Sequence, residues 1–138
     1  MYIKGISLLQ EIKVTDVTFT DRLEGLVTFT TNTLKEISAC FWGYKFKKGD
    51  VVTIEFYAVG CPHEWEVTFS KNKEEKLKLV QSNETTAYDA YGKIISINPV
   101  IADFGDLKLN IGNWTNDDKV IGEFIYWKIH RLEAKKIL

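Results

Sequence analysis

Apolar and polar residues alternate along several short segments of this chain, and the pattern is clearest between residues 91 and 131. A period of two places the apolar side chains on one face of a β-strand and the polar ones on the other. The apolar positions are Leu107, Leu109 and Ile111 in one segment and Ile125, Trp127 and Ile129 in another. Turn-forming residues such as Asn98-Pro99 and Gly112-Asn113 separate these segments. The stretch therefore predicts three antiparallel strands, around which the rest of the chain closes.

The same alternation occurs earlier in the chain. It predicts further strands over residues 26–31, 37–41, 52–58 and 65–69. Lys47 to Asp50 is expected to form the turn between two of them, with Gly49 where a positive φ is needed. The C-terminal tail LEAKKIL has the composition of a short helix. About seven to nine short antiparallel strands, spaced about 8–12 residues apart, are typical of an all-β Greek-key barrel or sandwich.

The segment from Tyr88 to Ala134 is loosely similar in composition to barrels of the OB fold. It has an order of short strands, a glycine near its start (Gly92) and a long turn before a final apolar strand. A β-sandwich would show the same pattern, so both architectures stay open. We expect a single all-β domain over residues 1–138, a barrel or sandwich that includes the OB-like form.

Composition and charge narrow the function classes. The chain has 138 residues, of which 45% are hydrophobic and 13% aromatic, enough for a core that needs no disulfide or metal. The net charge is −1, so the two signs nearly balance. A general binder of duplex DNA would be expected to show a basic surplus, and this class is therefore less favoured.

The N-terminal segment MYIKGISLLQEIK lacks the pattern of a signal peptide, and no apolar run is long enough to span a membrane. The two cysteines, Cys40 and Cys61, are more typical of free thiols than of a disulfide framework in a domain with an ample core. We therefore expect a small soluble cytoplasmic protein with no membrane partner. A secreted chain whose leader has been removed is the alternative.

Aromatic and basic residues interleave in the segment FWGYKFKK, residues 41–48. Proteins that bind single-stranded nucleic acid combine flat rings, on which bases stack, with cations that bind phosphates. On this interpretation the binding residues would be Trp42, Tyr44, Lys45, Lys47 and Lys48. The alternative is a hairpin in which Phe41 and Phe46 belong to the core and the lysines protect a turn or edge. The balanced overall charge favours this alternative.

Trp114 is a different kind of candidate, because it lies between Asn113 and Thr115 in a predicted turn. Exposed aromatic residues on loops often anchor protein interfaces. The alternative is a tryptophan that folds back and covers the end of the barrel, since tryptophan is largely buried on average. The sequence gives the two interpretations equal weight.

The sequence shows no convincing catalytic or metal-binding pattern. Cys61, His63 and Glu64 lie close together, but their spacing matches no zinc motif. Two predicted turns contain the acidic residues Asp103, Asp106, Asp117 and Asp118. Aspartate is a common calcium ligand, but it is also frequent in turns that bind no metal. His63 and His130 lie in no recognisable nucleophile motif, and no glycine-rich phosphate loop is present. We expect no metal and no cofactor, and the balance is against an enzyme.

These patterns favour a non-enzymatic protein-binding module whose partner is another protein. Its expected contact residues are Trp42, Tyr44 and Trp114. Proteins that neutralise toxins, of the immunity or antitoxin kind, fit because they need only a stable scaffold and a complementary surface. The alternative is an OB-like protein that binds single-stranded nucleic acid through residues 42–48.

Overall fold

The computed structural model describes residues 8–31, 34–59 and 64–136. These residues form ten strands, a short α-helix and one turn of 3-10 helix. The strands are β1 (Leu9–Asp21), β2 (Glu24–Thr30), β3 (Glu36–Trp42), β4 (Val51–Val59), β5 (Lys78–Gln81), β6 (Tyr88–Ser96), β7 (Ile101–Asp103), β8 (Lys108–Asn110), β9 (Phe124–Ile129) and β10 (Arg131–Lys136). The helices are α1 (Trp65–Ser70) and η1 (Asp118–Val120). The all-β prediction is confirmed, with one strand more than the expected range.

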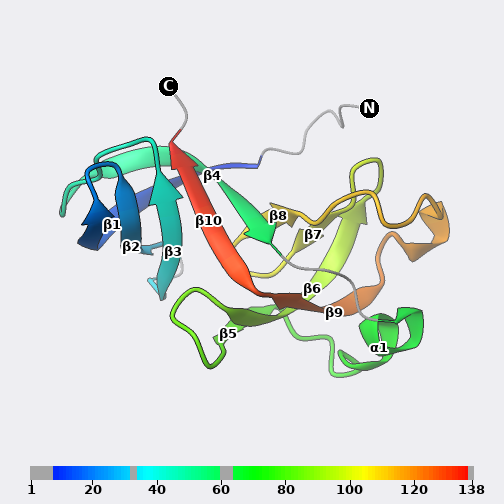
Figure 1. The fold of residues 1–138 in the computed structure, drawn as a ribbon. Helices are drawn as coiled ribbons and strands as arrows, with labels where there is room; N and C mark the ends of the chain where they lie inside the picture. Colours follow the sequence, from blue (N-terminus) through cyan, green and yellow to red (C-terminus); the bar gives the residue numbers. More distant parts are fainter. Residues whose placement is uncertain (1–7, 32–33, 60–63, 137–138) are drawn as a thin grey trace.

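Five of the strands close into a barrel (Figure 1). β1 pairs with β2 through its C-terminal half and with β4 through residues 9–13, so the longest strand joins the two ends of the sheet. β3 pairs with β2, and β10 lies between β3 and β4. The β3–β10 pair is parallel, whereas the other pairs of the barrel are antiparallel. The helix predicted for the tail LEAKKIL is therefore wrong, because the described part of this segment is the strand that completes the barrel.

The chain between β4 and β10 forms a second sheet that is attached to the barrel. β6 is its central strand and pairs with β5, β7 and β9. β7 pairs with β8, and β8 meets β4 in a parallel bridge between Asn110 and Tyr57. The stretch of residues 91–131 was expected to be the centre around which the chain closes. It belongs instead to this attached sheet, while the barrel closes through the first four strands and the last one.

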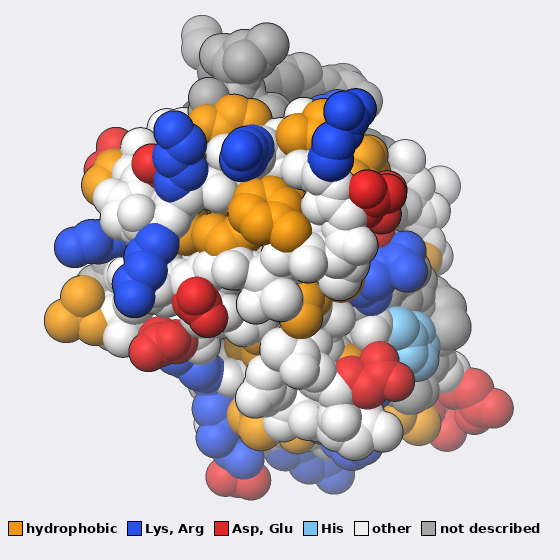
Figure 2. Space-filling model, turned by 60° about the vertical axis from the view of Figure 1, so that its left-hand side comes forward, with side chains coloured by type: hydrophobic (Ala, Val, Ile, Leu, Met, Phe, Trp, Pro, Cys, Tyr) orange, Lys and Arg blue, Asp and Glu red, His pale blue; other side chains and the backbone are white. Residues whose placement is uncertain are grey.

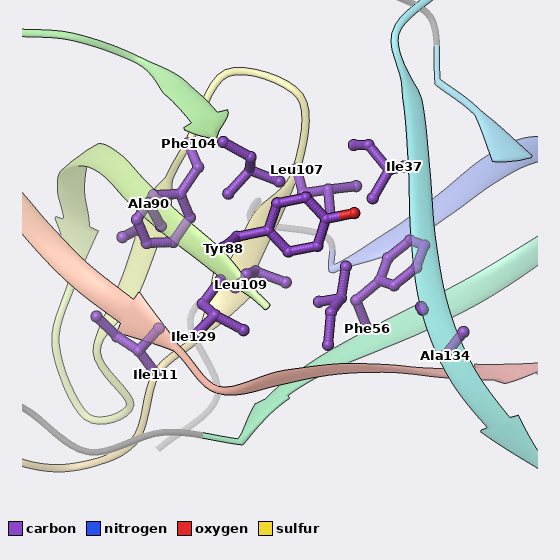
Figure 3. Close-up of a cluster of buried hydrophobic side chains, with 14 of the residues drawn as sticks. Ile37, Phe56, Tyr88, Ala90, Phe104, Leu107, Leu109, Ile111, Ile129 and Ala134 are labelled. Carbon is purple, nitrogen blue, oxygen red and sulfur yellow. The ribbon is translucent and has the colours of Figure 1, made fainter. Parts of the chain in front are cut away.

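The apolar faces predicted from the sequence are the buried ones. Leu107, Leu109 and Ile111 are buried, as are Ile125, Trp127 and Ile129 on β9. One continuous core extends from the barrel into the attached sheet, and Figure 3 shows Tyr88 of β6 between residues from both parts. Its hydroxyl accepts a hydrogen bond from the backbone N–H of Ser38 at 2.9 Å and donates to the Ser38 carbonyl at 3.1 Å.

The predicted strand over residues 65–69 is an α-helix in the structure. The spacing Trp65-x-x-x-Phe69 suits one face of a helix as well as one face of a strand, and only packing decides between them. The helix lies beside β9, where Phe69 packs on Trp114 at a ring distance of 5.9 Å. Asn72, just after the helix, donates hydrogen bonds to the carbonyls of Ile125 and Lys76. This packing holds the helix and the turn after it against β9.

In the described part of the chain, no helix has the length and apolar character that crossing a membrane would require.

Candidate functional site

The most exposed large aromatic side chain of the barrel is that of Trp42, the last residue of β3. Its exposed fraction is 52%, whereas its neighbour Phe41 is buried. Successive residues of a strand point to opposite faces of the sheet, so Trp42 projects from the outer surface of the barrel while Phe41 fills the interior.

A hollow lies on each side of Trp42, and we call the two together the Trp42 groove. The first has a volume of about 310 Å³ and crosses the outer face of β2, β3 and β10. The second, of about 300 Å³, lies against the turn between β1 and β2. The residues that line the first hollow include Glu24, Leu26, Cys40, Arg131 and Glu133, and those of the second include Asp21, Arg22, Leu23 and Gly43. Trp42 and Glu24 line both.

Charged groups of both signs surround the tryptophan. Three carboxylates, of Asp21, Glu24 and Glu133, and two guanidinium groups line the groove. The Nε of Arg131 donates to a carboxylate oxygen of Glu133 at 2.8 Å, and the Glu133 side chain is only 14% exposed. Carboxylates repel phosphates, so this lining suits a protein surface better than a nucleic-acid backbone.

Hydrophobic surface accompanies these charges. Leu23, at the tip of the β1–β2 turn, is 45% exposed and lines the groove beside Trp42. Figure 2 shows the side of the molecule that carries the barrel, with hydrophobic side chains gathered near the centre of the view and basic and acidic side chains around them. An apolar centre with a charged rim is the usual anatomy of a protein interface.

Tyr44 does not line this groove. It lies two residues beyond Trp42, after Gly43, whose φ of 79° turns the chain away from the strand. The Tyr44 ring meets Phe46 edge-on at 4.8 Å, and Phe46 in turn meets Phe41 at 5.0 Å. Tyr44 is therefore half-buried against the core, while Trp42 projects from the barrel.

Lys45, Lys47 and Lys48 are exposed on the segment that connects β3 to β4. The backbone N–H of Lys47 donates to the Asp50 carboxylate at 3.0 Å, and Gly49 has the positive φ that the sequence predicted for this turn. None of the three lysines lines either hollow beside Trp42. The structure therefore separates the tryptophan groove from the basic residues that were expected to act with it.

Trp114 lies in another part of the molecule. Its ring contacts Trp65, Phe69 and Trp127 at 6.0, 5.9 and 5.3 Å, so it joins α1 to β9. Its Nε1 is shielded from solvent and has no hydrogen-bond partner among the described residues. Figure 1 places α1 and the barrel strand β3 on opposite sides of the molecule. This packing favours the interpretation of Trp114 as a covering side chain, and we do not include it in the groove.

Sequence reasoning missed the residues that complete the groove. Glu24, Arg131 and Glu133 come from β2 and β10, and they meet Trp42 only because β10 pairs with β3. The alternation along each strand does identify these positions as outward-facing, but nothing local indicates which strands become neighbours.

The side chains of the groove are suited to binding a partner and do not indicate a particular chemical reaction. Its polar side chains are carboxylates, guanidinium groups and the Thr20 hydroxyl, beside one thiol, Cys40, whose Sγ lies 3.8 Å from the Thr86 hydroxyl. Over the residues that the structure describes, no group of three or more histidine, cysteine, aspartate and glutamate side chains could hold a metal ion. Cys61 and His63, which the sequence analysis considered as metal ligands, lie outside the described residues.

Comparisons of the chain with known protein families, with curated proteins and with solved structures found no match.

Proposed function

We propose that this chain is a non-enzymatic module that binds another protein through the Trp42 groove. The observation that carries the proposal is the half-exposed tryptophan between two hollows whose walls hold charges of both signs. Tryptophan and arginine are the residues most enriched among those that dominate binding energy at protein interfaces. Trp42 and Leu23 would supply the apolar anchor, and Glu24 and Arg22 at the rim would select the partner by charge.

The position of the groove supports this proposal. A five-stranded barrel is the architecture of the OB fold, in which the face of the second and third strands and the loop between the first two bind ligands. The Trp42 groove lies on the face of β2 and β3 and against the β1–β2 turn, and this position supports a binding role for it. OB-like barrels often bind single-stranded nucleic acid there, and this is the alternative function. The three carboxylates of the groove argue against it.

Neutralisation of a toxin, as by immunity or antitoxin proteins, remains the role that we favour for this chain within the proposal, since an exposed recognition groove on a closed scaffold is all that such a function needs. We also keep the cytoplasmic location that the sequence predicts as part of the proposal.

The test compares two tryptophans of nearly equal exposure. Trp42 is 52% exposed and Trp65, on α1, is 51% exposed. Tagged wild-type protein and the Trp42→Ala and Trp65→Ala variants would be used to capture partners from a lysate of the source cell, with and without nuclease. We expect one protein that is retained by wild type and by Trp65→Ala, and lost with Trp42→Ala. Truncation of a central anchor typically weakens binding by at least about 30-fold.

Retention of that protein by Trp42→Ala at unchanged affinity would contradict the proposal. Captured material that is lost both on nuclease treatment and with Trp42→Ala would instead indicate that the groove binds nucleic acid, the alternative function. Thermal melting of each variant shows whether the substitution has left the fold intact.

A further inference from the structure

A second surface, on the attached sheet, combines lysines with aromatic rings. The outward positions of β6 are Asp89, Tyr91 and Lys93, and those of β9 are Phe124, Tyr126 and Lys128. The register places Tyr91 opposite both Tyr126 on β9 and Lys78 on β5, while Lys93 is opposite Phe124. Directly opposite residues share a face of the sheet. We call this surface, together with Lys71 and Lys76 from the turn after α1, the lysine face.

Three lysines of this face lie over aromatic rings. The Lys71 ammonium is 4.3 Å from the centre of the Tyr126 ring, that of Lys76 is 5.4 Å from Tyr91, and that of Lys93 is 5.7 Å from Phe124. A ring holds a cation in place without cancelling its charge. The lysine face therefore keeps its positive charges in fixed positions above flat apolar surfaces.

Carboxylates neutralise only part of this charge. Asp89 lies 3.4 Å from the Lys128 ammonium, and Glu74 lies 3.4 Å from that of Lys76. Lys78 and Lys93 are exposed and have no ion pair among the described residues. Asp103 on β7 lies directly opposite Lys93 and therefore shares this face, so five ammonium groups meet three carboxylates in a chain whose net charge is −1. This is a local basic surplus that the overall charge conceals.

We infer that the lysine face binds single-stranded nucleic acid. Such strands require cations for the phosphates and rings for the bases, and this face presents both on neighbouring strands of a sheet. An acidic protein segment would use the ammonium groups alone and would leave the rings without a role. Tyr91 and Phe124 are half-buried beneath their lysines, so each lysine can move from its ring to a phosphate while a base stacks on the ring that it leaves.

Tyr126 and Asp89 have a supporting role on this face. The Tyr126 hydroxyl donates to the Asp89 carboxylate at 2.5 Å, and Lys128 lies on the same carboxylate oxygen. These contacts hold the Asp89 side chain against its neighbours. The bases would therefore stack on Tyr91 and Phe124, and Tyr126, only 4% exposed, would remain part of the sheet.

The experiment measures binding of a fluorescein-labelled oligothymidylate of about 15 nucleotides by anisotropy over a range of salt concentrations. The main variant is Lys78→Glu/Lys93→Glu, at two exposed positions. The matched control is Lys45→Glu/Lys48→Glu, which makes the same change of charge on the segment between β3 and β4. We expect the main variant to bind at least about ten-fold more weakly and to lower the slope of log affinity against log salt by about 1.4, while the control stays near wild type.

A second variant tests the rings. Tyr91→Leu keeps the apolar volume and removes the flat face, and it should weaken binding about ten-fold with little change in the salt slope. A labelled oligoglutamate peptide of the same length is the competing probe. Lys71→Gln, a milder change, replaces the double variant if thermal melting shows that the latter does not fold.

The inference is overturned if wild type does not bind the oligonucleotide at low salt, or if the control loses as much affinity as the main variant. It is also overturned if oligoglutamate binds as tightly as the oligonucleotide and Tyr91→Leu binds like wild type, because the face would then recognise an acidic protein. Trp42→Ala should leave oligonucleotide binding unchanged, so this inference and the proposed function fail independently.

Discussion

Replacement of Tyr88 by phenylalanine tests how the attached sheet is joined to the barrel. The Tyr88 hydroxyl is the partner of both backbone groups of Ser38, at 2.9 and 3.1 Å. β10 pairs with β3 only at Cys40 and Phe41, so Ser38 lies just beyond the end of that pairing. Phenylalanine keeps the ring, which fills the core shown in Figure 3, and removes only the atom that completes the hydrogen bonding of β3.

The magnitude follows from the burial of these groups. Tyr88 is 2% exposed and Ser38 is 9% exposed, so little water reaches the Ser38 N–H and carbonyl. Each buried backbone group left without a partner costs about 1–3 kcal/mol. Phenylalanine no longer buries a hydroxyl, which offsets part of that cost, and we expect a net loss of about 2–4 kcal/mol in the free energy of unfolding. This is a large fraction of a typical total of about 5–15 kcal/mol.

The assay is urea denaturation followed by tryptophan fluorescence, which reports on the four tryptophans of the chain. The midpoint should fall while the slope of free energy against urea stays constant, because the surface exposed on unfolding is unchanged. Hydrogen exchange gives a second readout, since the Ser38 amide should lose protection more than its neighbours.

The matched control is Tyr126→Phe. The Tyr126 hydroxyl also donates one hydrogen bond, but its acceptor Asp89 keeps Lys128 as a partner, so the loss should be only about 0.5–1.5 kcal/mol. A loss below about 0.5 kcal/mol for Tyr88→Phe would refute the reasoning, because it would mean that Ser38 finds other partners and that the hydroxyl is not what satisfies β3.

Three further predictions concern stability. Trp114→Ala should lower the free energy of unfolding by about 2–4 kcal/mol, because the ring contacts three other aromatic side chains. A melting temperature within about 2 °C of wild type would instead show that Trp114 is a surface residue. Gly92→Ala should lower the free energy of unfolding by at least about 2 kcal/mol, because an added Cβ would lie 2.6 Å from the Asp103 carbonyl oxygen and 2.5 Å from the Phe104 ring. An unchanged midpoint in urea would show that β7 can move to make room for the methyl group. Burial, followed by the hydrogen bond to Asp89, raises the pKa of Tyr126, so its proton is held more tightly in the folded chain. This contribution to stability is complete below the unfolded pKa of about 10 and is lost as the pH rises above it, so wild type should lose more stability above pH 10 than Tyr126→Phe, and parallel pH profiles would contradict this.

The pattern of the sequence determined the faces of the strands. Val27 and Phe29 on β2, like Ile54 and Phe56 on β4, occupy alternate positions in the chain, and all four are buried. Side chains of a strand alternate between its two faces, and this period of two can be recognised within one segment without knowing which other segments pair with it. For the same local reason, the turn at Gly49 could be predicted with its positive φ.

Other elements depended on partners that are distant in the sequence. The segment WEVTF fits a strand and a helix equally by its apolar spacing, and contact with Trp114 and with β9 selects the helix. The tail LEAKKIL has helical composition, but its described part fills the position between β3 and β4 as a strand, where backbone pairing outweighs a propensity of a few tenths of a kcal/mol per residue.

The candidate site shows the same division. The sequence identified Trp42 as a side chain that could face solvent, and it could not show that Glu24 and Arg131 lie beside it. The lysine face likewise draws Lys78, Tyr91 and Phe124 from three strands whose order is set only when β6 pairs on both sides. The alternation of apolar and polar side chains is a property of each strand. Which strands become neighbours is decided by closure of the barrel and by packing of the shared core. The sequence by itself thus determined which side chain stands at each outward-facing position, and the tertiary structure decided which of those side chains lie together on one surface.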